Sequence, residues 1–215
     1  MGSSSAAYIG IDLTCTPAKP SACAVLGERG EFLDASVQRA DQNIIDYVLS
    51  FRPAIVAIDS PLGFPRGMCC LEDSCPCESV HDFKGRTAER ELLRSGVRLY
   101  ITTKKTFIKP MIYRAIRIAE TLRVDGIEAI EVYPYAAKRA LFGPDIPPKT
   151  TRAGIEFLRE RLLLLVPDLG GSGERLTHDV CDALLAAHTA WLHSAGRTVS
   201  YGDADEVPIV APVSA

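Results

Sequence analysis

The stretch "YIGIDLTCT", residues 8–16, combines an apolar run with a single acid, Asp12. The run is small and apolar and shows no alternation, which predicts a strand buried on both faces of a sheet. A carboxylate at the end of a buried strand needs a partner or a function. The stretch therefore predicts both the central strand of the fold and the first residue of a candidate site.

The segments that follow predict a mixed α/β order. Residues 22–37, "ACAVLGERGEFLDASV", read as two strands joined at Glu28-Arg29-Gly30. Further strands are expected within 53–61, "PAIVAIDSP", and 127–134, "IEAIEVYP". Helices are expected within 42–52, 85–96, 109–126, 134–143, 151–167 and 177–196. A three-strand meander followed by helices and strands is typical of a ribonuclease H-like fold, whereas a doubly wound sheet alternates strand and helix from its start.

Length and composition fit one globular domain. The chain has 215 residues, of which 47% are hydrophobic and 24% charged. We expect one ribonuclease H-like domain over 6–215, with a mixed five-stranded sheet, flanking helices and a cysteine-containing insertion at about 60–109. Residues 1–5 are expected to be a flexible leader. The sequence shows neither a signal peptide nor an apolar run long enough to span a membrane, so a cytoplasmic protein is expected.

The charge is unevenly distributed along the chain. The formal net charge is −3, but residues 84–123 hold 11 Lys and Arg residues against three Glu residues, a local charge of +8. A basic middle in an acidic chain favours an anionic partner. Solvated helix faces are the alternative interpretation.

Acids stand at the ends of three expected strands. Asp12 and Asp59 end two of them, and Glu131 lies near the end of a third. Asp179 and Asp182 share one face of the last helix, because residues three apart lie together. Such carboxylates would repel one another unless a cation bound between them, and Mg²⁺ and Mn²⁺ prefer oxygen ligands. Taken singly, each acid could instead cap a helix or a turn, or lie on the surface.

Several short motifs in a fixed order resemble a known family. "GIDLT", "AIDSPLGFP", "FIKPMIYRAI", "IEVYPYAAKRALFG" and "HDVCDALLAAHTAWL" look like domain of unknown function 429, a predicted-nuclease family of the ribonuclease H-like superfamily. The resemblance runs from about Tyr8 to the C-terminal "GDADEVPIVAP". More distantly, the chain is similar to Holliday-junction resolvases of the RuvC type. That similarity implies metal ligands at Asp12, Asp59, Asp179 and Asp182. The resolvases carry Glu where this chain has Asp59, and Glu131 has no counterpart among their ligands, so it is a reserve candidate.

The basic segment offers a surface for phosphates. Lys104, Lys105, Lys109 and Arg114 would neutralise a nucleic-acid backbone, and aromatic residues such as Tyr113 could stack on unpaired bases. The alternative is that the apolar side chains of this segment form core and the cations are solvated.

Four of the seven cysteines lie within nine residues, at Cys69, Cys70, Cys75 and Cys77. Four thiolates can bind Zn²⁺. The usual C-x₂-C spacing is absent, and an iron–sulfur cluster, the disulfides Cys69–Cys77 or Cys70–Cys75, and free thiols remain open.

Together these features predict a nuclease that hydrolyses phosphodiester bonds in DNA or RNA by a two-metal mechanism, with Mg²⁺ or Mn²⁺ as cofactor and structural Zn²⁺ as an addition. Two alternatives stand beside it: an actin-like ATP-dependent phosphotransferase, and a non-catalytic nucleic-acid binder that retains the fold. A membrane partner is not expected, and a homodimer is left open.

Overall fold

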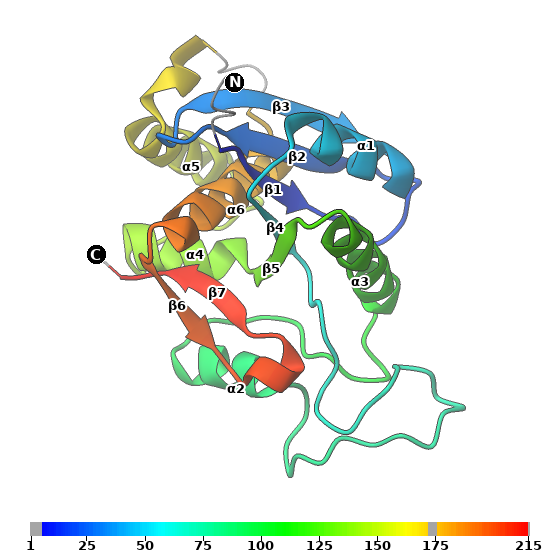
Figure 1. Ribbon diagram of the computed structural model, residues 1–215. Coiled ribbons are helices and arrows are strands. Elements are labelled where there is room, and N and C mark those ends of the chain that lie inside the picture. The colour runs from blue at the N-terminus through cyan, green and yellow to red at the C-terminus, as the bar shows by residue number, and fades with distance from the viewer. Residues whose placement is uncertain (1–5, 172–175, 215) are drawn as a thin grey trace.

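A computed structural model describes residues 6–171 and 176–214, and the leader 1–5 lies outside the described residues. Within these ranges the chain forms seven strands in one mixed sheet and six α-helices (Figure 1). The strands are β1 (Tyr8–Asp12), β2 (Ser21–Leu26), β3 (Phe32–Gln38), β4 (Ile55–Asp59), β5 (Glu128–Val132), β6 (Thr198–Tyr201) and β7 (Ile209–Pro212). The helices are α1 (Asp41–Phe51), α2 (Thr87–Arg94), α3 (Lys109–Val124), α4 (Pro134–Phe142), α5 (Arg152–Leu165) and α6 (His178–Ser194). No described helix meets the length and hydropathy required to cross a membrane.

The strand order is β3-β2-β1-β4-β5-β7-β6. The first three strands form an antiparallel meander, and β4 and β5 then add in parallel to β1. This is the ribonuclease H-like order, and it confirms the fold class expected from the sequence.

The expected count of five strands is wrong, because β6 and β7 extend the sheet beyond β5. Each of these strands has only four residues. Such short segments carry little periodicity, and Pro208 and Pro212 beside and within the last strand predict a loop rather than a strand.

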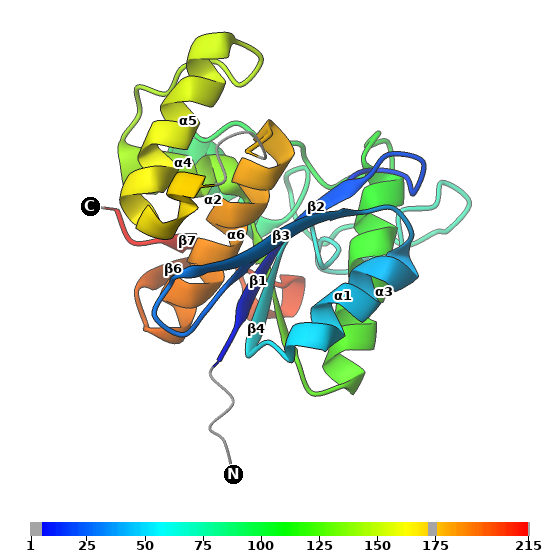
Figure 2. The ribbon, with the colours of Figure 1, turned by 90° about the horizontal axis from the view of Figure 1, so that it is seen from above.

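Helices cover both faces of the sheet, as Figure 2 shows from above. On one face α1 and α3 pack over Ile9 and Ile11 of β1. On the other face α6 crosses β1, β2 and β4, with α4 and α5 beside it. Successive side chains of β1 point to opposite faces of the sheet, so its apolar residues contribute to two separate cores.

Gly10 allows α6 to lie directly against the central strand. A Cβ added at Gly10 would lie 2.0 Å from the carbonyl oxygen of Ala183 and 2.2 Å from the amide nitrogen of Ala187. Both are backbone atoms of α6, so no side-chain rotation relieves the clash. The glycine of "YIGID" therefore sets the distance between β1 and α6, and with it the placement of the acids that these two elements carry.

We expect Gly10→Ala to lower the free energy of unfolding by about 1–3 kcal/mol, the usual cost of overpacking a core. Denaturant titration of the full chain measures this cost. Gly170→Ala is the matched control, because a Cβ there meets no atom within 4 Å. Equal stability of the two variants would contradict the close packing of α6 on β1.

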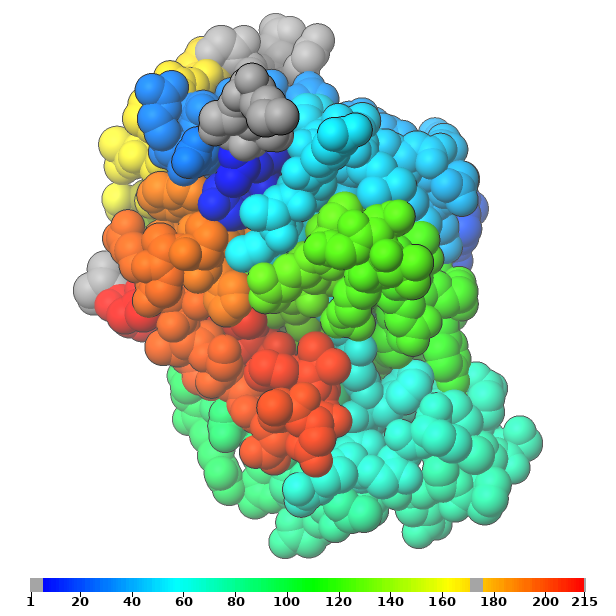
Figure 3. Space-filling model, in the orientation of Figure 1, coloured from blue at the N-terminus to red at the C-terminus, as the bar shows by residue number. Residues whose placement is uncertain are grey.

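Between β4 and α2 the chain leaves the sheet as an irregular segment. Residues 61–86 form neither helix nor strand and protrude at one end of the molecule (Figure 3). Leu71 in this segment is fully buried, packed with Ile108 and Ile112 of the region around α3. The segment is therefore anchored to the domain although it lacks regular structure.

Candidate functional site

The candidate site lies where β1 and β4 end beneath α6. Asp12 and Asp59 are the last residues of these neighbouring parallel strands, and the register pairs Ile11 with Ile58 just before them. The two aspartates therefore lie side by side at one edge of the sheet, on the face that α6 covers. The second turn of α6 carries Asp182, whose side chain is buried.

Two lysines accompany Asp182. Lys138 of α4 places Nζ 2.5 Å from Oδ1 of Asp182, and Lys149 donates a hydrogen bond of 2.6 Å from Nζ to Oδ2. The side chain of Lys138 is 7% exposed and that of Lys149 is 52% exposed. Asp182 is thus held between a buried cation and an accessible one.

The electrostatic environment shows that the acids form one group. Burial, followed by the negative charge of Asp182, raises the pKa of Asp12 to about 7, and Asp179 adds to the rise. Burial, followed by the charges of Asp12 and Asp182, also raises the pKa of Asp59 well above its ordinary value. Lys149 and Lys138 oppose both shifts but do not cancel them. Burial is therefore the main reason that Asp12 and Asp59 hold their protons, and the neighbouring carboxylates add to it.

The carboxylates of Asp12 and Asp59 stand apart from the hydrogen-bond network. Among the residues described, every hydrogen bond at this edge of the sheet goes to other groups, and none reaches these two carboxylates. A partly buried carboxylate without a donor is costly. The arrangement leaves oxygen atoms free for a ligand with positive charge.

A pocket of about 400 Å³ opens beside these acids. Asp59, Asp182, Lys138, Lys149 and His178 all contribute to its wall. His178 is the first residue of α6, its Nδ1 is buried without a hydrogen-bond partner, and burial lowers its pKa. Carboxylates, ammonium groups and a neutral imidazole thus surround a space large enough for a small polar group.

The raised pKa of Asp12 predicts how stability depends on pH. Its value is about 7 in the folded chain against 3.8 ordinarily, so the folded state holds a proton that the unfolded state releases. In cation-free buffer this stabilising contribution is complete below about pH 4 and is lost as the pH rises through 7. We expect Asp12→Asn to match wild type in unfolding free energy near pH 4 and to exceed it increasingly up to pH 7.5. Denaturant titrations across this range measure the difference, and a gap that does not change with pH would contradict the assignment.

Glu131 belongs to a different set of contacts. The register pairs Glu131 with Ile58, so its side chain leaves the sheet on the face opposite to Asp59. Both of its oxygens bind the guanidinium of Arg86, and Oε2 also accepts a hydrogen bond of 2.8 Å from the Leu62 amide. Glu131 stands one residue before Val132, the residue that pairs with Asp59, and this difference of one position separates Glu131 from the aspartates.

Arg86 and Glu89 form a buried network with Glu131. Both side chains are fully buried, and Arg86 Nε donates to Glu89 Oε1 at 3.1 Å. Arg86 also donates to the carbonyl oxygens of Glu206 and Val207. The network joins α2, β5 and the segment before β7.

The basic residues expected to bind phosphate divide into two groups. Arg114 is buried, with its guanidinium bound to Asp41 and to the carbonyl oxygen of Thr14. Lys104 donates to the carbonyl oxygen of Cys75, and the hydroxyl of Tyr113 accepts from the Leu71 amide at 2.8 Å. These three side chains hold the fold together. Lys105 is exposed and Lys109 half-buried, so both remain available at the surface.

The four clustered cysteines lie in the protruding segment, outside the walls of the acid pocket. All are free thiols, and their sulfur atoms lie within 4.8 Å of one another. The structure therefore separates a carboxylate site from a thiol site.

Sequence reasoning missed Lys138 and Lys149. Lys138 follows the buried Ala136 and Ala137 on α4, and a lone cation on the inner face of a helix is the signal that could have identified it. Lys149 stands in an irregular stretch before α5, and its approach to Asp182 depends on the path of that stretch.

Comparisons with known proteins give a family and a structural neighbour for this chain. A family model described as "Protein of unknown function (DUF429)" matches residues 10–207. A search of solved structures finds the "Thermus thermophilus RuvC structure", with 16% sequence identity and a TM-score of 0.42, covering 94% of this chain and 99% of that chain. No curated protein matches the chain.

Proposed function

The chain belongs to the DUF429 family of proteins of unknown function, and within that family we propose that it is a nuclease that hydrolyses phosphodiester bonds with the help of divalent cations. The observation that carries this proposal is the convergence of Asp12, Asp59 and Asp182 from β1, β4 and α6. Three separate elements bring carboxylates together, and burial, followed by the charges of neighbouring carboxylates, raises the pKa of Asp12 and of Asp59. Raised pKa values at a pocket are typical of functional sites.

The donor set fits a hard divalent cation. The aspartates offer only oxygen atoms, which Mg²⁺ and Mn²⁺ prefer, and neighbouring carboxylates add to the burial that raises the pKa of Asp12 and Asp59. Over residues 6–171 and 176–214, the cysteines are the sole group of three or more ligating residues gathered within 4.8 Å. Asp12, Asp59 and Asp182, all within those ranges, do not form such a group.

Asp12, Asp59 and Asp182 would hold the cations, with Asp179 at the exposed rim. When bound, such cations polarise a phosphate and lower the pKa of a water molecule, which is the chemistry that phosphodiester hydrolysis requires. Asp12 interacts electrostatically with both Asp182 and Asp59, so its carboxylate would be a ligand central to the site. A bound cation would offset the repulsion among these carboxylates.

The lysines and His178 act on the substrate side of the same pocket. Lys149 is half-exposed and can move from Asp182 to a non-bridging phosphate oxygen, and buried Lys138 holds Asp182 in place. The lowered pKa of His178 keeps its imidazole neutral near pH 7, so that its unpartnered Nδ1 can accept a proton. The chain thus supplies charge compensation and a proton acceptor within one pocket.

A nucleic-acid strand would extend away from the acids. Asp59 also lines a second depression, which continues to Tyr100, Ile108 and Met111. Tyr100 and Phe107 are 61% and 65% exposed, and their ring centroids are 4.6 Å apart. Exposed aromatic rings beside lysines such as Lys105 are the elements that bind unpaired bases and phosphates. We therefore expect a single-stranded region in the preferred substrate.

Cleavage of labelled oligonucleotides tests the function. Single-stranded, duplex and branched DNA, and the matching RNA, are incubated with Mg²⁺, Mn²⁺, or EDTA. We expect cleavage with Mg²⁺ or Mn²⁺ that EDTA abolishes, because the aspartates then lack their cations. Binding without cleavage under every condition would overturn the nuclease proposal in favour of a binding protein, and cation-dependent ATP hydrolysis without cleavage would favour the phosphotransferase.

A further inference from the structure

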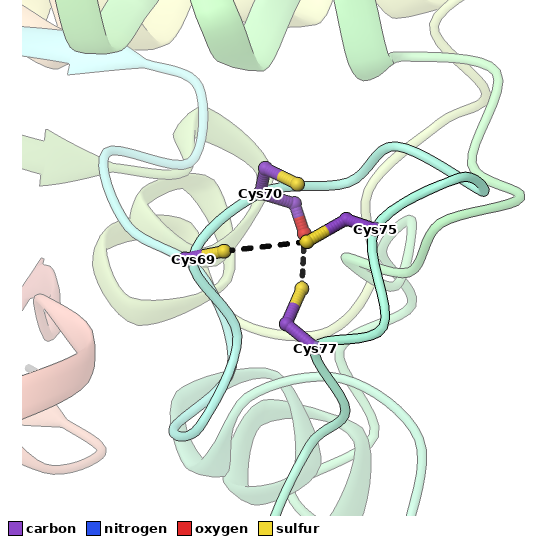
Figure 4. A group of neighbouring side chains, drawn as sticks. All are labelled: Cys69, Cys70, Cys75 and Cys77. Atoms are coloured by element: carbon purple, nitrogen blue, oxygen red, sulfur yellow. Dashed lines mark hydrogen bonds between the residues drawn. The ribbon is translucent and has the colours of Figure 1, made fainter.

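We infer that Cys69, Cys70, Cys75 and Cys77 form a second metal site, a surface tetrathiolate that binds one Zn²⁺ ion. Figure 4 shows the four side chains gathered from two limbs of the irregular segment. Their sulfur atoms all lie within 4.8 Å of one another, and those of Cys69 and Cys75 are 3.5 Å apart. Four sulfurs at Zn–S distances of about 2.3 Å in a tetrahedron are about 3.8 Å apart. The sulfur–sulfur distances are thus close to those around a single tetrahedral Zn²⁺ ion.

Side chains of adjacent residues such as Cys69 and Cys70 diverge, and the path of the backbone allows them to share one site. Cys69 and Cys70 come from one limb of the segment, and Cys75 and Cys77 return on the other. A turn in which the Cys75 amide donates to the Glu72 carbonyl oxygen, at 3.1 Å, reverses the chain between them. The Val80 amide also donates to the Arg66 carbonyl oxygen, at 2.9 Å, and closes the base of the segment. All four sulfurs can therefore converge although the C-x₂-C spacing is absent.

The geometry separates this site from the other thiol chemistries. A disulfide requires only pairs of sulfurs at about 2.05 Å, whereas here all four approach one another without bonding. An iron–sulfur cluster places several irons and sulfides between its cysteines and needs them further apart. His81 is not a ligand, because its Nε2 lies 2.5 Å from Glu206 Oε1 and its ring stacks on Phe83.

The surroundings of the thiols suit a metal with a structural role. Thiolates select a soft or borderline ion such as Zn²⁺, whereas the carboxylate site selects Mg²⁺ or Mn²⁺. Lys104 donates to the Cys75 carbonyl oxygen and brings a positive charge beside four thiolates whose net charge with Zn²⁺ is −2. A single ion would fix a long segment that has no helix or strand. The site would hold the irregular segment in place without taking part in the chemistry at the aspartates.

Metal analysis of the purified full chain tests this site independently of any nuclease activity. We expect one Zn²⁺ per chain, X-ray absorption with four sulfur neighbours at about 2.3 Å, and intense thiolate-to-cobalt absorption after Co²⁺ replacement. Cys75→Ser and Cys77→Ser should each lower the bound zinc at least about tenfold. The matched control is Cys15→Ser, a half-buried free thiol outside the group, and it should retain full zinc.

Circular dichroism on every variant separates loss of metal from loss of fold. Stoichiometric zinc that falls in Cys75→Ser and Cys77→Ser but not in Cys15→Ser, with folded protein throughout, supports the site. Protein without zinc, in which the four cysteines are freely reactive thiols or form two disulfides, would overturn it. So would protein that contains iron in place of zinc, or a zinc content that neither substitution changes.

Discussion

Asp12→Asn is expected to reduce divalent-cation-dependent cleavage on the order of 10³-fold, the scale reached when one preorganised electrostatic group is removed from an active site. The amide preserves the shape of the side chain but removes the charge that would hold the cations. Initial rates of oligonucleotide cleavage at saturating Mg²⁺ and Mn²⁺ measure the loss. Asp59→Asn should show a similar loss, because its carboxylate lies beside Asp12 at the same sheet edge.

Stability separates this loss from misfolding. In cation-free buffer at pH 7.5 we expect the melting temperature of Asp12→Asn to equal or exceed that of wild type, since the substitution relieves repulsion with Asp182 and Asp59. Asp125→Asn is the matched control, because Asp125 is an exposed acid at the C-terminal end of α3. A control with lost activity, or an Asp12→Asn enzyme with wild-type rates, would contradict the role of Asp12.

Arg86→Met is expected to destabilise the chain by about 3–5 kcal/mol, the usual cost of leaving a buried charge without its partner. Arg86 is fully buried and binds Glu131 through two nitrogens and Glu89 through a third. Methionine fills much of the volume but leaves both carboxylates without a counter-charge. Urea denaturation at pH 7 measures the loss.

Two further variants show whether the unpaired charge is the cause. Arg94→Met removes an exposed cation from the same helix and should change stability by no more than about 0.5 kcal/mol. Adding Glu131→Gln to Arg86→Met should recover part of the loss, because one buried charge is removed. The double variant could instead lose more unfolding free energy than the two single variants lose in sum. The destabilisation would then come from lost packing and not from the carboxylates.

The sequence was sufficient to predict the fold class and the meeting of the aspartates. Both follow from local patterns: Asp12 and Asp59 end apolar runs that can only be buried strands, and carboxyl ends of parallel strands share an edge. Asp179 and Asp182 follow from helical spacing. Gly10, in the same motif, explains how the helix comes close enough to bring Asp182 to that edge.

The misses arose where three-dimensional packing decides the outcome. Asp59 ends its strand, whereas Glu131 is one residue short of the end of β5, so its side chain lies on the opposite face of the sheet and binds Arg86. Arg86 and Glu89 have the composition of a solvated helix start, but Arg86 binds Glu131 and the carbonyl oxygens of Glu206 and Val207. Glu89 in turn accepts hydrogen bonds from Thr102. Lys149 reaches Asp182 from an irregular stretch whose path no periodicity describes.

Packing also decides how much of the positive charge of residues 84–123 lies at the surface. Its excess of cations predicts an anionic surface partner, yet the buried Arg86 and Arg114 are paired within the fold. Lys105 and Lys109 remain at the surface. Net charge counts buried and exposed cations equally, so the basic surface that remains for nucleic acid is smaller than the sequence suggests.

Anomalous scattering from crystals soaked in Mn²⁺ tests the central claim most directly. The account predicts manganese peaks between Asp12, Asp59 and Asp182, with Lys149 displaced from Asp182, and no such peaks in crystals of Asp12→Asn. Crystals in which Mn²⁺ is absent from this edge of the sheet, while Lys138 and Lys149 stay on Asp182 at saturating cation, would contradict it.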